Sequence, residues 1–99
     1  MKNAYSVLKE VSVFFNVDLS EIKSRARDKR TAVARLAYYM LASIHTGLSD
    51  RQIGNTVNRD RTTVCLGRKR FEKNLHDDEI LKFKTGRLDA RIMRLCDEN

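Results

Sequence analysis

A run of hydrogen-bonding side chains at residues 59–64 is the part of this chain best suited to reading another polar molecule. It reads Arg-Asp-Arg-Thr-Thr-Val and leads into a basic amphipathic stretch that extends to Leu75. Arg61 can donate two hydrogen bonds to guanine, Thr62 offers a methyl and a hydroxyl group, and Asp60 can accept from a cytosine amino group. The run therefore predicts base contacts by Asp60, Arg61 and Thr62 at the start of a helix that lies in a DNA major groove.

Each of these side chains also has a simpler interpretation. Asp60 can be the N-cap of a helix that begins at residue 61, Arg61 a solvated surface charge, and Thr62 and Thr63 an ordinary first helical turn. Basic residues near the run and elsewhere can neutralise phosphates without reading sequence, or can simply be solvated. These candidate phosphate contacts are Arg25, Arg30, Arg51, Arg59, Lys69 and Arg70.

A second basic segment covers residues 23–30. It holds five basic residues and one acid, a local charge of 5 − 1 = +4, and it has no apolar periodicity. Such a connection can lie over phosphates or insert an arginine into the minor groove, where groove width and A·T content are read. A solvated charge run is the simpler alternative.

The composition favours one small, basic, helical domain. The chain has 99 residues, a formal net charge of +7, no Pro or Trp and four Gly. A basic balance fits a nucleic-acid partner without being unique to one. Cys65 and Cys96 are isolated and fit a reduced compartment, and neither a signal peptide nor a membrane span is evident. We expect a cytoplasmic, nucleoid-associated protein.

Apolar periodicity predicts an all-α fold, a compact bundle of about six helices within a single domain, residues 1–99. Helices are expected at residues 3–16, at a short segment opened by an Asp18/Glu21 capping box, and at residues 31–46, the most apolar and central one. The last of these ends at Gly47. Its inward residues are expected to be Val33, Leu36, Ala37, Met40, Leu41 and Ile44.

The second half of the chain reads as a helix-turn-helix followed by one more helix. Ser49 and Gln52 form a second capping-box pattern, and Gly54 in that short helix is expected to admit another helix. A tight turn at residues 58–59 precedes a helix over residues 61–75, and a C-terminal helix spans residues 78–95 beyond the core at residues 3–75. Its apolar members are Ile80, Leu81, Phe83, Leu88, Ile92 and Leu95.

The sequence offers little for catalysis. His45 and His76 are isolated from one another and from metal-spaced partners, and no Gly-x-x-x-x-Gly-Lys-[Ser/Thr] phosphate loop is present. The acids at residues 77–79 are explained by the positive end of the last helix. We expect no enzymatic activity, no metal site and no cofactor.

Several stretches of the chain resemble the C-terminal DNA-binding domain of DnaA, the bacterial replication initiator. The specific part is residues 59–64, with the order Arg-Asp-x-Thr-Thr-Val. Residues 16–24 (Asn-Val-Asp-Leu-Ser-Glu-Ile-Lys-Ser), the basic connection, residues 33–35 (Val-Ala-Arg), and Leu48-Ser49 with Ile53-Gly54 support it. The likeness covers roughly residues 5–75.

The resemblance implies a six-helix domain that binds a short asymmetric box in duplex DNA. In this family an arginine of the basic connection enters the minor groove and the helix-turn-helix enters the adjacent major groove. By position the minor-groove arginine is Arg27. The resemblance likewise implies base contacts by Asp60, Arg61 and Thr62, and phosphate contacts by Lys29, Arg35 and Thr63.

The chain departs from the family at several positions. The family has His where this chain has Arg61, Gln where it has Leu36, and usually Pro where it has Arg51. The family also has a further turn residue before the position of Arg59. Arginine at a base-reading position predicts an altered preference, towards guanine, so the family's own box is not carried over. Because the ATPase motif is absent, we expect the DNA-reading module alone, either as a free-standing small protein or as an excised domain. The initial Met and the tidy helical ends favour a complete small protein.

Other functions remain open from the sequence. Residues 78–95 can pair with a protein partner or a second copy, making the chain an interaction module. A nonspecific nucleic-acid binder and a binder of structured RNA are also compatible with the charge. Duplex RNA is distinguishable because a recognition helix cannot enter its narrow major groove.

Overall fold

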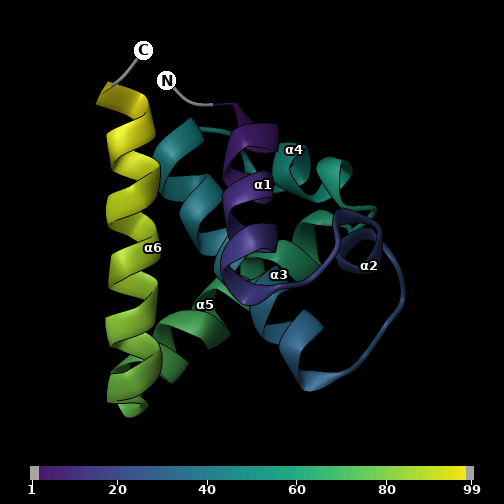
Figure 1. Ribbon diagram of the computed structural model, residues 1–99. Helices are drawn as coiled ribbons and strands as arrows, with labels where there is room; N and C mark the ends of the chain where they lie inside the picture. The colour runs from purple at the N-terminus through teal and green to yellow at the C-terminus, as the bar shows by residue number, and fades with distance from the viewer. Residues whose placement is uncertain (1–2, 98–99) are drawn as a thin grey trace.

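The computed structural model describes residues 3–97, with side chains as far as Leu95. In chain order the helices are α1 (Ala4–Phe15), α2 (Leu19–Lys23), α3 (Lys29–Thr46), α4 (Asp50–Thr56), α5 (Arg61–Asp77) and α6 (Glu79–Asp97). This described part contains no strand. The all-α prediction of six helices is therefore confirmed. In Figure 1, α6 stands along one side of the bundle, and α2 with the connection after it lies on the opposite side.

Helix α3 is the centre of the molecule, as predicted. It contacts each of the other five helices, most extensively α1 and α5. The buried side chains around it come from all parts of the described chain. They are Val7, Leu8, Val11, Val17, Ile22, Ala34, Tyr38, Tyr39, Leu41, Ala42, Ile53, Val57, Val64, Leu88 and Ile92.

Periodicity predicted part of the buried surface of α3. Ala37 and Leu41 are fully buried and Leu36 and Met40 pack against the core, as predicted, but the rest of the surface differs. Ile44 is exposed, whereas the rings of Tyr38 and Tyr39 are buried. Since α3 is covered from several sides, no single apolar stripe marks its interior. The Tyr38 hydroxyl is paired with the Thr56 hydroxyl at 2.5 Å, so a polar group is accommodated in the core.

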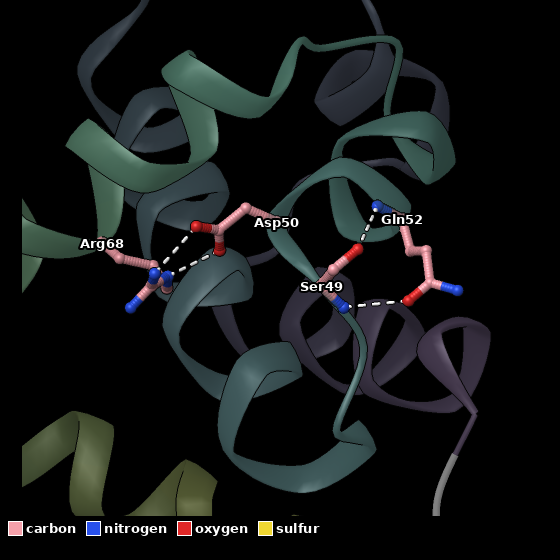
Figure 2. Close-up of polar contacts among 4 residues, drawn as sticks. All are labelled: Ser49, Asp50, Gln52 and Arg68. Carbon is pink, nitrogen blue, oxygen red and sulfur yellow. Dashed lines mark hydrogen bonds and ion pairs between the residues drawn. The ribbon is translucent and has the colours of Figure 1, made fainter.

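Capping side chains set the helix starts, with two differences from expectation. Helix α3 begins two residues early because the Asp28 carboxylate accepts a 3.1 Å hydrogen bond from the Thr31 amide. Lys29 and Arg30 therefore lie in a helical turn and not in the connection. Asp18 is the N-cap of α2 but its side chain makes no capping hydrogen bond, so the first predicted capping box is wrong. The box at Ser49 and Gln52 forms as predicted (Figure 2).

The turn between α4 and α5 depends on Gly54. Its carbonyl oxygen accepts hydrogen bonds from the Val57 amide at 3.0 Å and the Arg59 amide at 2.9 Å, and Asn58 adopts a left-handed φ of 60°. A Cβ at Gly54 would lie 2.3 Å from the Arg59 carbonyl oxygen. The close neighbour of Gly54 is thus the backbone of this turn and not another helix, which corrects our expectation.

Close helix approach occurs instead at Gly67 of α5. A Cβ there would lie 2.7 Å from the Tyr39 ring and 3.0 Å from a Leu36 methyl carbon. The lack of a side chain at Gly67 lets α5 rest directly on α3.

Helix α6 is held by one stripe and two polar contacts. Leu88 and Ile92 are fully buried, His45 of α3 lies 2.6 Å from Asp89, and Arg91 pairs with Glu10 of α1 at 3.3 Å. Ile80 and Phe83, two of the apolar members named for this helix, are 70% and 67% exposed. Only one side of α6 meets the domain, so the apolar residues outside that stripe stay in solvent.

Glycine substitutions test the turn. Gly54→Ala should destabilise the fold by about 1–3 kcal/mol, because the added methyl meets backbone that cannot move without opening the turn. Gly86→Ala in α6 is the matched control, since nothing lies within 4 Å of its Cβ position. That change should stabilise the fold by roughly 0.5–1 kcal/mol through helix propensity. Urea unfolding measures both, and equal effects of the two substitutions would contradict the assignment.

Candidate nucleic-acid interface

The N-terminus of α5 presents Asp60, Arg61 and Thr62 to solvent. All three are exposed, and Asp60 is the N-cap, its carboxylate accepting a 2.9 Å hydrogen bond from the Thr63 amide. Hydrogen bonding by the Thr63 side chain and backbone lowers the pKa of the Asp60 carboxyl. The capping role of Asp60 is therefore confirmed. The base contacts of these residues stay a prediction.

An ion pair sets the orientation of α5 against α4. Arg68 donates from Nε to Asp50 Oδ1 and from a terminal nitrogen to Oδ2, both at 2.9 Å (Figure 2). Both side chains are largely shielded from solvent. The hydrogen bond from Arg68 lowers the pKa of the Asp50 carboxyl. A two-pronged pair of this kind fixes direction as well as distance, so Arg68 holds the two helices together.

The buried side chain of Arg35 binds the backbone at the start of the basic loop, residues 25–28. Only 8% of Arg35 is exposed, and its guanidinium donates to the carbonyl oxygens of Glu21, Ile22, Ser24 and Ala26 at 2.6–3.0 Å. Burial lowers the pKa of Arg35. Its donors are directed at the end of α2 and the start of the loop. We therefore withdraw the phosphate contact that the resemblance implied for Arg35, and assign it to shaping the loop.

Arg59 joins the basic loop to the helix-turn-helix. Its guanidinium donates to the carbonyl oxygens of Val57 and Asn58 in the turn, and its other terminal nitrogen donates to the Ser24 carbonyl oxygen. Ser24 thus receives hydrogen bonds from both Arg35 and Arg59. The two segments that the sequence marked as DNA-contacting are physically connected through one carbonyl group.

Two adjoining hollows gather most of the predicted contact residues. One, of about 570 Å³, lies between α3 and α5, and the other, of about 430 Å³, lies beside the basic loop. They share Arg35 and Arg59. The predicted residues in the first are Lys29, Arg35, Arg59, Thr63 and Arg70, and those in the second are Arg25, Arg27, Arg35 and Arg59.

Three predicted phosphate contacts lie elsewhere. Lys69 is exposed on α5 and Arg51 is exposed in the first turn of α4, while Arg30 lines a separate hollow near the start of α6. Arg30 is therefore not brought together with the residues of the basic loop, although it directly follows Lys29.

The sequence reasoning missed one candidate interface residue. Leu66 of α5 is 61% exposed and lines the hollow between α3 and α5. It lies one turn after Thr62 and Thr63, where an apolar side chain can contact a thymine methyl group or a sugar. Helical spacing from Thr62 was the signal that could have identified it.

The described residues contain neither a grouping of metal-ligating side chains nor a membrane-spanning helix. Between residues 3 and 95, no group of three His, Cys, Asp or Glu side chains is arranged to hold a metal ion. Across the same part of the chain, no helix has the length and apolar character to cross a membrane.

Comparison with known proteins agrees with this geometry. Residues 4–70 match the family model of the bacterial DnaA protein helix-turn-helix. The chain belongs to this family. Its match covers the basic loop and the turn, as well as the exposed start of α5.

Three curated relatives are named chromosomal replication initiator protein DnaA or DnaA 2. The chain is 31% identical over 86 residues to the chromosomal replication initiator protein DnaA of Thermoanaerobacter sp. strain X514, covering 87% of this chain and 19% of the relative. It is 27% identical over 94 residues to DnaA of Oleidesulfovibrio alaskensis, covering 95% and 20%. DnaA 2 of Chlamydia pneumoniae is 33% identical over 78 residues, covering 78% and 17%. The chain thus spans about a fifth of the length of these relatives.

A substitution at Arg35 tests the loop assignment. Arg35→Lys keeps the charge but cannot reach four carbonyl groups, so we expect a loss of about 1–3 kcal/mol in the free energy of unfolding. Amide hydrogen exchange at residues 24–28 should also accelerate. The exposed Arg25→Lys is the matched control and should stay within about 0.5 kcal/mol. Indistinguishable behaviour of the two variants would refute the assignment.

The Asp50–Arg68 pair predicts a specific acid sensitivity. Because the pKa of Asp50 is lowered from 3.8 in the folded state, the pair stabilises the fold above that pH and is lost as the pH falls through the lower folded value. Asp50→Asn should cost about 1–3 kcal/mol at neutral pH, and the deficit should shrink below about pH 4. Asp18→Asn, at an N-cap without a side-chain bond, is the control. A deficit independent of pH would count against the ion pair.

Proposed function

We propose that this DnaA-type domain binds double-stranded DNA in a sequence-specific manner and acts, by occupying its sites, as a regulator of transcription or replication. The observation that carries the proposal is the exposed run Asp60-Arg61-Thr62 at the start of α5, tied through Arg59 to the basic loop. Membership of the bacterial DnaA helix-turn-helix family supports it. Occupancy, and not catalysis, is the proposed mode of action.

The major groove is the proposed position of α5. Its 17 residues make a helix about 25 Å long, and side chains at its N-terminus extend furthest into a groove. Arg61 supplies a two-pronged contact to guanine, Thr62 contacts a base edge, and the Asp60 carboxylate accepts from an amino group while it caps the helix. The positive end of α5 favours a phosphate near Thr63.

The adjacent minor groove is the proposed position of Arg27. It is exposed on the basic loop, whose backbone is bound to Arg35 and, at Ser24, to Arg59. These hydrogen bonds restrict the distance between the basic loop and α5. Arg27 and the start of α5 must therefore contact the two grooves at a fixed spacing along the DNA. One copy of the chain then contacts a short site without two-fold symmetry. Arg25, Lys29 and Arg70, which line the two hollows beside these elements, are the proposed contacts to flanking phosphates.

The curated relatives are named chromosomal replication initiator proteins. Since the chain matches only about a fifth of their length, we assign it the DNA-reading step alone. A DNA-binding domain of this kind acts at the nucleoid in the cytoplasm, where it can exclude other proteins from its sites.

Selection from a random duplex library tests specificity. The wild-type protein should enrich one asymmetric motif. Arg61→Ala should relax one or two positions of it, at a cost of about 1–3 kcal/mol on the best site. A motif that is unchanged in Arg61→Ala would disprove base reading by this residue, and the absence of any motif would indicate nonspecific coating.

Lys69→Ala is the control that distinguishes a loss of nonspecific electrostatic affinity from a loss of sequence preference. It should weaken all duplexes alike and reduce the slope of log affinity against log salt by about 0.9. The selected motif should stay the same in this variant.

A further inference from the structure

An apolar groove lies between the end of α1 and the start of α6 and opens onto the exposed side of α6. Its deeper part, about 500 Å³, is walled by Phe14 and Phe15 at the end of α1 and by Ile80 and Phe83 at the start of α6. This is the lower end of α6 in Figure 1. Monomeric domains rarely leave large apolar side chains grouped in solvent without an interaction partner.

The groove opens onto a shallow face of α6 that is about three turns long and is lined by residues of α6 alone. A second hollow, of about 580 Å³, shares Phe83 and Arg87 with the first and extends past Gly86 to Ala90. Nothing lies within 4 Å of the Cβ position of Gly86, and Ala90 is exposed. The small residues make a shallow floor, so another helix can come close to the α6 backbone there.

The rim of the groove is predominantly basic. Arg30, Lys84 and Arg87 surround the deeper part, with no acid among its lining residues. Lys82 and Glu79 add opposite charges along the second part. The site therefore combines large apolar side chains with an excess of cations.

We propose that this groove binds an acidic amphipathic helix of a partner protein. Such a helix lays apolar residues spaced at i, i+3/i+4 and i+7 into a groove, while its carboxylates meet Arg30, Lys84 and Arg87. About ten residues suffice to follow α6 from Ile80 to Ala90, since a helix rises 1.5 Å per residue.

A second copy of the chain is a poor occupant on electrostatic grounds. Pairing α6 with another α6 brings Lys82, Lys84 and Arg87 against the same cations, in a protein of net charge +7. Like charges held close together oppose association.

Single-stranded nucleic acid also fits less well. Stacking of bases needs free aromatic faces along a strand, but Phe14 and Phe15 are partly buried and pack edge to face, with centroids 5.2 Å apart. Only Phe83 presents an open ring in the deeper part. An apolar side chain of a protein partner can pack against all the aromatic and aliphatic residues of this hollow, whereas a base can stack on Phe83 alone.

The partner site and the candidate DNA interface are separate. None of Arg27, Arg61 and Thr62 lines the α6 groove, so the groove can be occupied with or without DNA. The proposal does not depend on the proposed function, and a partner held on α6 would be carried to whatever the other face binds.

The test pans a displayed library of random peptides of about 16 residues, long enough for four helical turns, on the whole chain. Selected peptides should be acidic, with large apolar residues at helical spacing. Their affinities, from fluorescence anisotropy, should fall about tenfold or more in Phe83→Ser, and also in Lys84→Glu/Arg87→Glu. Met93→Ser is the control, because Met93 is exposed on α6 but lines neither hollow. Thermal unfolding must show that all variants fold.

Several results would overturn the proposal. No enrichment, enrichment of peptides without acids, or affinities unaffected by Phe83→Ser each rule out an acidic helix here. Two other measurements identify a different occupant. Sedimentation that shows self-association abolished by Phe83→Ser indicates a second copy, and binding of labelled oligothymidine lost in Phe83→Ser indicates single-stranded nucleic acid.

Discussion

The carbonyl group of Ser24 connects the two parts of the candidate interface, the basic loop and the helix-turn-helix. It accepts hydrogen bonds from Arg35, which is buried in α3, and from Arg59, which lies in the turn before α5. A loop with two arginines in four residues would otherwise spread into solvent, because these cations repel one another and the loop backbone has no helical hydrogen bonds. Two arginines satisfy that backbone instead. The loop therefore takes its position from the same turn that aims the recognition helix.

The position of α5 depends on a few contacts that leave little freedom. Gly54 lets the turn fold back on α4, the Asp50–Arg68 pair fixes rotation against α4, and Gly67 lets α5 rest on Tyr39 of α3. Together they place one exposed end of a long helix at a defined angle to the basic loop. A binding surface that is preorganised in this way loses less entropy on association than a flexible one.

The distribution of charge and apolar surface divides the molecule into two faces. Arginines and lysines surround the recognition helix and the loop, whereas apolar residues with a basic rim follow α6. Arg30 lies on the second face although its neighbour Lys29 lies on the first, because adjacent residues of a helix point about 100° apart. A basic chain of this size thus has room for a nucleic acid and a protein on different sides.

Much of this could be predicted from the amino-acid sequence. Local signals were sufficient for the helix order, the second capping box, the tight turn and the Asp60 cap, since each depends on residues within four positions of one another. The family was also apparent, because its specific element at residues 59–64 is contiguous. Periodicity found part of the interior of α3 but missed Tyr38 and Tyr39, because that helix is covered on several sides. In α6 it did not separate the buried Leu88 and Ile92 from the exposed apolar residues, because only one stripe is buried. In both helices, the neighbours decide which apolar residues are inside.

The sequence by itself thus determined the elements, the family and the exposed end of α5 that presents Asp60, Arg61 and Thr62. Only the tertiary structure decided which groups Arg35 and Arg59 contact. Arg35 and Arg59 read in the sequence as further cations for phosphates, yet their partners are carbonyl groups up to 35 positions away. A guanidinium serves equally well as a phosphate ligand or as a donor to backbone, and its choice depends on which oxygens the fold brings within reach. Nothing in the local residue pattern encodes that proximity.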